Sequence, residues 1–212
     1  MVTNILITAG PTWVALDNTR VISNIASGKT GALLAGAFRR LGDNVTLVAG
    51  EAEFGCVDKK VRVIRFKFFK ELSGIVIKEL KSRKYKIIIH SAAVSDYQPR
   101  KVFNKKIESG KNKLQIELVP TPKIISLMRR VAPCAFLVGF KFEPGAKKNL
   151  LLGEARQLLI KSGVDLVVAN TIIKGTYRAY ILNKTLVEGP FTSKDSMVRN
   201  LVKMIHREKK NI

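Results

Sequence analysis

The stretch Ser23-Asn-Ile-Ala-Ser-Gly-Lys-Thr-Gly31 decides how this chain begins to fold, because it leads from a buried strand into a helix. The strand is expected at Ile5–Ala9 and is followed by the turn Gly10-Pro11-Thr12. Small residues leave the first N–H groups of the helix accessible, and these groups, together with the helix dipole, favour an anion. The stretch therefore indicates a phosphate-bearing ligand. The alternative is that Ser27 only N-caps the helix while the two glycines allow close packing on the sheet.

Two familiar phosphate-binding motifs do not match this stretch. A P-loop has a glycine five residues before the glycine of its Gly-Lys-Thr, but Ser23 stands there and no glycine lies in 21–27. A dinucleotide fingerprint requires G-x-G-x-x-G directly between strand and helix, whereas a long excursion separates Gly10 from Gly28. The lysine that follows Gly28 is therefore not a P-loop lysine.

Beyond this stretch, apolar runs alternate with amphipathic segments along the chain, which is typical of a doubly wound α/β sheet. Near-continuous Ile and Val in two of the strands indicate that both of their faces are covered, as in a parallel sheet. Without a repeat, low-complexity segment or linker, residues 1–212 are expected to form a single domain. Strands are expected at 5–9, 45–49, 61–65, 86–91, 135–140 and 165–169, and helices at 28–41, 69–82, 122–131, 147–162 and 193–207.

Two segments interrupt the alternation, and each is expected to form a hairpin. Lys105–Leu118 would turn at Gly110-Lys111-Asn112, and Arg178–Glu188 would turn near Asn183-Lys184. The first lies between a strand and the next helix, so it would form an inserted arm placed to cover a ligand. The sequence thus predicts a mostly parallel sheet with a hairpin arm.

Composition limits the class of protein. With 212 residues, of which 46% are hydrophobic, the chain can bury a substantial core. Cys56 and Cys134 lack metal or redox spacing, which predicts packing roles in a reducing compartment rather than a disulfide. No apolar run is long enough to span a membrane, and the first residues lead directly into a strand rather than a cleavable leader. A cytoplasmic protein without membrane association is therefore expected.

The charge of the chain is strongly positive: 38 Lys and Arg against 16 Asp and Glu give a net charge of +22. Such a field attracts nucleic acid, anionic lipid or small polyanions without discriminating among them. Aromatic residues are not interleaved with arginine in a way that suggests base stacking, so any binding of nucleic acid would be non-specific and electrostatic. A solvated basic surface without a partner explains the charge equally well.

The carboxyl ends of the predicted strands are where ligands bind in open α/β sheets. The run His90-Ser-Ala-Ala-Val-Ser-Asp-Tyr97 follows the fourth strand. Ala92 and Ala93 would let the main chain approach a flat ring, and Asp96 offers a carboxylate to a ribose hydroxyl or a metal. Asp96 could instead cap a turn, and His90 is interpreted as a structural histidine at the end of a strand.

Six pieces of this sequence stand in the order and at the approximate spacing of phosphopantothenate-cysteine ligase, which the chain resembles from the first strand to about residue 170. The resemblance implies a Rossmann-like fold and a homodimer in which an arm of one subunit closes the site of the other. It also implies a ligase that uses Mg²⁺ and either CTP or ATP to join 4'-phosphopantothenate and cysteine through an acyl nucleotidylate, without flavin. The pieces are Thr8-Ala-Gly-Pro-Thr12, Ser23-Asn24 with Ser27-Gly28-Lys29 and Gly31, Ala92-Ala-Val-Ser-Asp-Tyr97, Lys106-Ile107, Gly139-Phe140 and Asp165-Leu-Val-Val-Ala-Asn170.

The resemblance also assigns roles to single residues. Asn24 matches the asparagine that engages the acyl nucleotidylate in the cysteine step, and Lys106 matches the arm lysine that supports the first step. Asp96 is expected on the ribose or the base of the nucleotide, and the metal ligands stay unassigned. The residues expected to bind the nucleotide are Gly10, Ser27, Gly28, Lys29, Ala92, Ala93, Asp96, Pro122, Lys123, Ile124, Ile125, Phe140 and Lys161.

Several positions depart from the family pattern. Trp13 and Val14 replace an Arg-Glu pair, Ala26 replaces a serine, Leu158 replaces a lysine, and Lys161 matches a second lysine only with a shift of one residue.

Two other classes of protein are kept open. A nicotinamide-dependent oxidoreductase would need the glycine fingerprint that the first turn lacks, and a non-catalytic nucleic-acid-binding protein would explain the charge.

Overall fold

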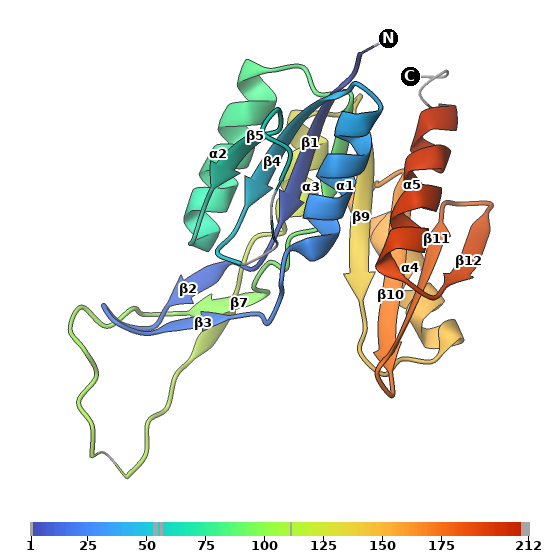
Figure 1. The fold of residues 1–212 in the computed structure, drawn as a ribbon. Helices are drawn as coiled ribbons and strands as arrows, with labels where there is room; N and C mark the ends of the chain where they lie inside the picture. The colour runs from blue at the N-terminus through green and yellow to red at the C-terminus, as the bar shows by residue number, and fades with distance from the viewer. Residues whose placement is uncertain (1, 53–54, 56, 111, 209–212) are drawn as a thin grey trace.

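A computed structural model describes residues 2–52, 55, 57–110 and 112–208. Eight strands of this part of the chain form one sheet in the order β12-β11-β10-β9-β6-β1-β4-β5 (Figure 1). All pairs from β10 to β5 are parallel, which confirms the predicted doubly wound sheet. The strands are β1 Asn4–Ala9, β4 Asn44–Ala49, β5 Arg62–Arg65, β6 Ile87–His90, β9 Phe136–Phe142, β10 Leu166–Ile173, β11 Thr176–Leu182 and β12 Val187–Phe191.

Helices cover both faces of the sheet, and each face has its own hydrophobic core. One core joins the sheet to α1 and α5, and the other joins it to α2, α3 and α4. Alternate residues of β1 show this directly, since Ile5 and Ile7 belong to the first core and Leu6 to the second, all fully buried. The helices are α1 Lys29–Arg40, α2 Phe69–Ser82, α3 Ile124–Val131, α4 Lys148–Ser162 and α5 Lys194–Glu208.

One end of the sheet is antiparallel. β11 pairs with β10 and with β12, so the predicted hairpin over 178–188 is confirmed as part of the main sheet. Its turn is held by Asn183, whose Oδ1 accepts hydrogen bonds from the N–H groups of Thr185 and Leu186 at 2.9 and 2.8 Å. The asparagine side chain thus replaces the main-chain contacts that a shorter turn would make.

The predicted hairpin over 105–118 is wrong. Its described residues before Leu118 form no strand, and residue 111 of the expected turn lies outside the described part of the chain. The pairing occurs instead at the base of the arm, where β7 (Tyr97–Pro99) runs antiparallel to β8 (Leu118–Pro120). An isolated hairpin is marginally stable, and the mostly exposed, charged residues of this segment give it no apolar face to bury.

A second small ribbon accompanies the arm. β2 (Trp13–Ala15) pairs antiparallel with β3 (Val21–Ser23) inside the excursion between β1 and α1. Figure 1 shows β2, β3, β7 and the long loop of the arm projecting together beyond the ends of the parallel strands, at the end of the sheet opposite to the two chain termini. We call this end the carboxyl edge of the sheet. It carries the segments that the sequence assigns to the site.

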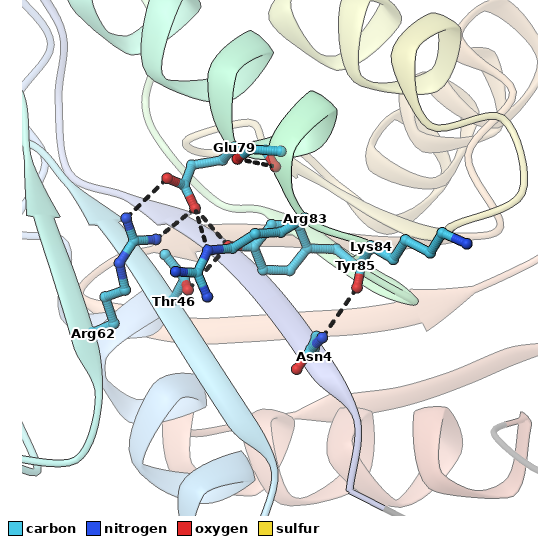
Figure 2. Close-up of polar contacts among 8 residues, drawn as sticks. Asn4, Thr46, Arg62, Glu79, Arg83, Lys84 and Tyr85 are labelled. Carbon is cyan, nitrogen blue, oxygen red and sulfur yellow. Dashed lines mark hydrogen bonds and ion pairs between the residues drawn. The ribbon is translucent and has the colours of Figure 1, made fainter.

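The opposite, amino edge is braced by a buried carboxylate. Glu79 on α2 receives a bidentate contact from Arg62 of β5 and a hydrogen bond of 2.6 Å from the hydroxyl of Tyr85 (Figure 2). The Tyr85 oxygen also accepts a hydrogen bond from the hydroxyl of Thr46 of β4, with 3.1 Å between the two oxygens. The Arg62 contact above all lowers the pKa of Glu79, against the effect of burial. This network ties the edge strand β5 to the body of the molecule.

Two further expectations concern residues away from the core. Cys134 is an exposed free thiol, so its predicted packing role is wrong, and Cys56 lies outside the described residues. Cys134 sits in the turn between α3 and β9, where the chain follows the surface.

In the described part of the chain, none of the helices has the length and apolar character needed to cross a membrane.

Candidate functional site

The start of α1 has the geometry that the sequence indicates. Gly28 precedes the helix with φ +66°, a left-handed conformation that costs other residues about 1–2 kcal/mol. A Cβ atom on Gly31 would lie 2.3 Å from the Cβ of Ala9, so the helix packs on β1 more closely than alanine permits. Ser27 is not the N-cap, because Gly28 takes that position; the Oγ of Ser27 accepts a long hydrogen bond of 3.4 Å from the main-chain nitrogen of Lys29. Within these described residues the first turn carries no acidic side chain, which suits an anion.

Asn24 connects this helix start to the loop after β6. Its side-chain amide nitrogen donates to the carbonyl oxygens of Ala93 and Val94 at 3.2 and 3.1 Å. The N–H of Ala93 in turn donates to the carbonyl of Gly10 at 2.9 Å. Three predicted site segments are therefore joined by direct hydrogen bonds. Since both amide hydrogens face carbonyl groups, the Oδ1 atom of Asn24 is the one that can accept a hydrogen bond from a ligand.

Buried hydroxyl groups hold these loops together below the surface. The Oγ1 of Thr12 accepts from the N–H of Ser95 at 2.9 Å, and the Oγ of Ser95 donates to the carbonyl of Thr12 at 3.2 Å. Thr121 donates through its hydroxyl to the carbonyl of Ser95 at 2.6 Å, next to the start of α3. All three side chains are buried, so the three loops are fixed relative to one another. Sequence reasoning missed this network, because isolated Ser and Thr residues give no signal of long-range pairing.

The start of α3 lies beside Asp96. The ammonium group of Lys123, the N-cap residue of α3, forms an exposed ion pair with the carboxylate of Asp96. Ile124 and Ile125 bury their side chains in the core, and Pro122 is exposed. Any contact from the two isoleucines to a nucleotide would therefore come from main-chain N–H groups.

The arm is anchored by a residue that the sequence analysis did not single out. Asp17, in the turn between β2 and β3, accepts the N–H of Ile107 at 2.9 Å across 90 positions of the chain. Arg20 donates to Asp17 at 3.0 Å and to the carbonyl of Ile107 at 3.1 Å. The Ile107 hydrogen bond is the largest of the contacts that hold the pKa of Asp17 well below its usual range. Lys106, the predicted catalytic lysine, is the exposed residue next to this anchor.

His90 lies at the carboxyl end of β6, under the loop that carries Ala92 and Ala93. Its Nδ1 is 2.8 Å from the hydroxyl of Thr8, and burial lowers its pKa to about 4. The imidazole is therefore neutral at physiological pH, which agrees with its interpretation as a structural histidine.

Phe140 and Lys161, two further predicted nucleotide residues, occupy different parts of the molecule. Phe140 is half-buried and packs on the α1 and α5 side of the sheet, whereas Ile125 packs on the opposite side. Lys161 occupies the last turn of α4, which starts near the carboxyl edge and runs 15 residues, about 22 Å, towards the amino edge. It hydrogen-bonds Gln157 of its own helix at 2.9 Å.

The residues that depart from the family pattern have packing partners. Trp13 contacts Phe68 edge to face, with 6.0 Å between the ring centres, and the ammonium of Lys67 lies 5.6 Å from the indole centre. Val14 is buried in the core, and Leu158 would contact a Cβ placed on Gly139 at 3.1 Å. Trp13 thus fills space at the base of the arm rather than offering a charged group to a ligand.

Of two cavities in the described part of the chain, one lies beside these elements and one lies at the opposite edge of the sheet. One of about 290 Å³ lies at the base of the arm and is lined by Trp13, Phe68 and Arg100, among others. A larger one, of about 650 Å³, lies at the amino edge between α4, α5 and the β11–β12 turn. The described residues that line the larger cavity include none of the predicted site residues, so the candidate site is the open surface at the carboxyl edge.

Comparison with known proteins identifies the family of this chain. Residues 2–208 match the DNA/pantothenate metabolism flavoprotein C-terminal domain. A coenzyme A biosynthesis bifunctional protein CoaBC from Thermococcus kodakarensis is 38% identical over 169 residues, which are 79% of this chain and 41% of the relative. The corresponding protein of Vibrio cholerae is 34% identical over 96% of this chain and 52% of its own length. The chain thus spans about half the length of the curated relatives it matches.

Solved structures show the same fold. The DNA/pantothenate metabolism flavoprotein from Streptococcus pneumoniae superimposes with a TM-score of 0.86 at 27% identity, covering 97% of this chain and 99% of the other. A Cab2 mutant, H337A, in complex with phosphopantothenate-cysteine superimposes with a TM-score of 0.74 at 20% identity, covering 97% of this chain and 87% of the other. By its sequence over nearly its whole length, this chain belongs to the family of the DNA/pantothenate metabolism flavoprotein C-terminal domain.

Proposed function

We propose that this chain is a phosphopantothenate-cysteine ligase of coenzyme A biosynthesis. It would join 4'-phosphopantothenate and L-cysteine in two steps, with CTP or ATP as co-substrate. The observation that carries the proposal is the convergence of Asn24, the Ala92–Asp96 loop and the glycine-started helix α1 at one edge of the sheet. The names of the relatives, which are coenzyme A biosynthesis bifunctional proteins, support the substrate class.

In the first step a carboxylate oxygen of phosphopantothenate attacks the α-phosphorus of the nucleotide, and the bond to the β-phosphate breaks to release pyrophosphate. Negative charge builds up on the phosphate oxygens, so this step needs cations and N–H donors more than a nucleophile. Lys106 on the anchored arm would supply a cation, and the start of α1 at Gly28 and Lys29 would supply main-chain N–H groups. Asp96 would accept a hydrogen bond from the ribose once Lys123 moves to a phosphate.

In the second step the amine of cysteine attacks the acyl carbonyl, the nucleoside monophosphate leaves, and the amine loses a proton as the amide forms. Asn24 is already held by Ala93 and Val94 through its amide nitrogen. Its Oδ1 would accept a hydrogen bond from the attacking amine and orient the nitrogen lone pair towards the carbonyl.

Mg²⁺ would enter with the nucleotide. Among the described residues, no group of three or more His, Cys, Asp or Glu side chains could hold a metal ion. Mg²⁺ commonly keeps several waters and is bound by substrate phosphates with one or two carboxylates, so the residues present suit an ion carried by the triphosphate. The ion would neutralise charge on the phosphates.

We also propose a homodimer that uses the projecting ribbons. Val21 and Ile22 of β3, Tyr97 of β7 and Leu118 of β8 expose between 37% and 56% of their surface, and Ile25 next to Asn24 is completely exposed. Apolar residues that gather on a projecting element commonly mark an interface between proteins. A second subunit seated here would cover the site and bring its own arm close. Light scattering after size exclusion should give the mass of two chains, and a monomer at micromolar concentration would contradict this part of the proposal.

The ligase proposal is tested by supplying phosphopantothenate, Mg²⁺ and cysteine with CTP or ATP, and by measuring both pyrophosphate and product mass. An amide product that depends on cysteine would support the proposal and identify the preferred nucleotide. Salt-sensitive DNA binding without turnover would favour the non-catalytic alternative.

A further inference from the structure

We infer that Asp17 is a positioning residue for the arm: its carboxylate fixes the main chain at Ile107 and thereby sets where the side chain of Lys106 can reach. The inference rests on the proposed function, in which Lys106 assists the first step. Asp17 belongs to the turn between β2 and β3, far in sequence from the arm. It is a residue of the scaffold that would act on catalysis only through the arm.

The hydrogen bonds divide between the two oxygens of the carboxylate. Oδ1 accepts from the N–H of Thr19, the hydroxyl of Thr19 and the N–H of Arg20, at 2.8, 2.9 and 2.7 Å. Oδ2 accepts from the guanidinium of Arg20 at 3.0 Å and from the N–H of Ile107 at 2.9 Å. One oxygen therefore shapes the local turn, and the other holds the arm. Every partner is a donor, which only a group that accepts at both oxygens can satisfy.

The anchor lies partway along the arm. The β7–β8 ribbon holds its base, the N–H of Phe103 donates to the carbonyl of Leu16 at 3.0 Å, and Ile107 is the next fixed residue. The side chain of Ile107 is buried, whereas 104–106, 108–110 and 112–115 are exposed. Lys106 thus starts from a fixed main-chain position while the segment beyond it stays in solvent. Without the anchor, the lysine would sample the whole reach of a long loop, and its effective concentration at the phosphates would fall.

Asp17→Asn separates the two functions of the carboxylate. If the amide oxygen keeps the three contacts of Oδ1, its NH₂ group faces the donors of Arg20 and Ile107, so the turn survives and the arm anchor is lost. Thr19→Ala is the matched control, because it removes one contact of the same carboxylate on the side that does not hold the arm. Arg20→Met is the second variant, in case Asp17→Asn does not fold, since it removes the guanidinium that links Oδ2 to the Ile107 carbonyl.

Two measurements on the full chain test the inference. The first is limited trypsin cleavage after Lys106, together with hydrogen exchange of the Ile107 amide. We expect both to be at least about tenfold faster in Asp17→Asn and in Arg20→Met, and unchanged in Thr19→Ala. Equal rates in Asp17→Asn and the native chain would overturn the anchor.

The second measurement is pyrophosphate release, which follows the first step. We expect Asp17→Asn to slow it about tenfold with an unchanged dissociation constant for the nucleotide. In the double variant, Asp17→Asn should not slow pyrophosphate release below the rate of Lys106→Ala alone, because Asp17 acts through that lysine. Native-like pyrophosphate release with a freed arm would overturn the positioning role, as would losses that multiply in the double variant. If the native chain releases no pyrophosphate with either nucleotide, the proposed function fails, and the cleavage experiment still decides whether the anchor exists.

Discussion

The side-chain nitrogen of Asn24 lies 3.2 Å from the carbonyl oxygen of Ala93, although 69 positions separate the two residues. This contact joins the segment before α1 to the loop after β6 and leaves Oδ1 of Asn24 for a ligand. It gives the candidate site a defined centre, around which the predicted roles of the other residues can be tested.

Asn24→Ala should block the second step more than the first. We expect amide formation to slow by about 10²- to 10³-fold, as for the loss of one well-placed hydrogen-bonding group in an active site. The acyl nucleotidylate should then accumulate and be detected by mass spectrometry. Asn18→Ala, which changes an exposed asparagine of the neighbouring turn, is the control and should behave like the native chain. Native rates of amide formation in Asn24→Ala would remove the residue from the mechanism.

Lys106→Ala should suppress the first step, because an ammonium group would no longer approach the α-phosphate. Pyrophosphate release is expected to fall by about 10²-fold or more, while the fold and the nucleotide affinity change little. Lys105→Ala removes an equally exposed charge one residue earlier and serves as the comparison. Equal losses in the two variants would mean that only the total charge of the arm matters.

Asp96→Asn should weaken nucleotide binding by about tenfold, because a hydrogen bond to a charged acceptor would be lost. Titration calorimetry with CTP and ATP measures the effect. Glu117→Gln is a matched control, since Glu117 forms a similarly exposed ion pair with Arg100 at 2.8 Å, near the base of the arm. If both variants bind nucleotide as the native chain does, Asp96 only holds Lys123 at the start of α3.

His90 should make the stability of the fold depend on pH. Its folded pKa of about 4 lies below the ordinary value of 6.5, so the unfolded chain takes up a proton first as the pH falls. Its contribution is present above pH 6.5 and is lost progressively down to about pH 4, for a total of about 3 kcal/mol at most. His90→Asn should flatten the free energy of unfolding over this range in urea denaturation, whereas His206→Asn, at an exposed position of α5, should not. If the free energy of unfolding of His90→Asn still falls as the pH is lowered from 6.5 to 4, the pH dependence comes from other groups.

Local pattern in the sequence predicted the parallel sheet well, since runs such as Ile87–Ile89 are buried on both faces and bounded by turns. It also predicted the glycine-started helix at Gly28 and the hairpin over 178–188. The hairpin predicted over 105–118 was wrong because charged residues can adopt an extended form without pairing. The Asp17 anchor was missed because Asp-Asn-Thr signals a turn but does not identify Ile107 as the partner. Contacts between distant loops, such as Thr12 with Ser95, leave no periodic trace in the sequence.

The ligase proposal is tested most directly by the mass of the product formed from 4'-phosphopantothenate and cysteine in the presence of Mg²⁺ and a nucleoside triphosphate. We expect phosphopantothenoylcysteine together with one pyrophosphate and one nucleoside monophosphate, and a loss of product when cysteine is left out while pyrophosphate release continues. If no amide forms with CTP or ATP, and folded protein is confirmed by its cooperative unfolding, the proposed function is wrong.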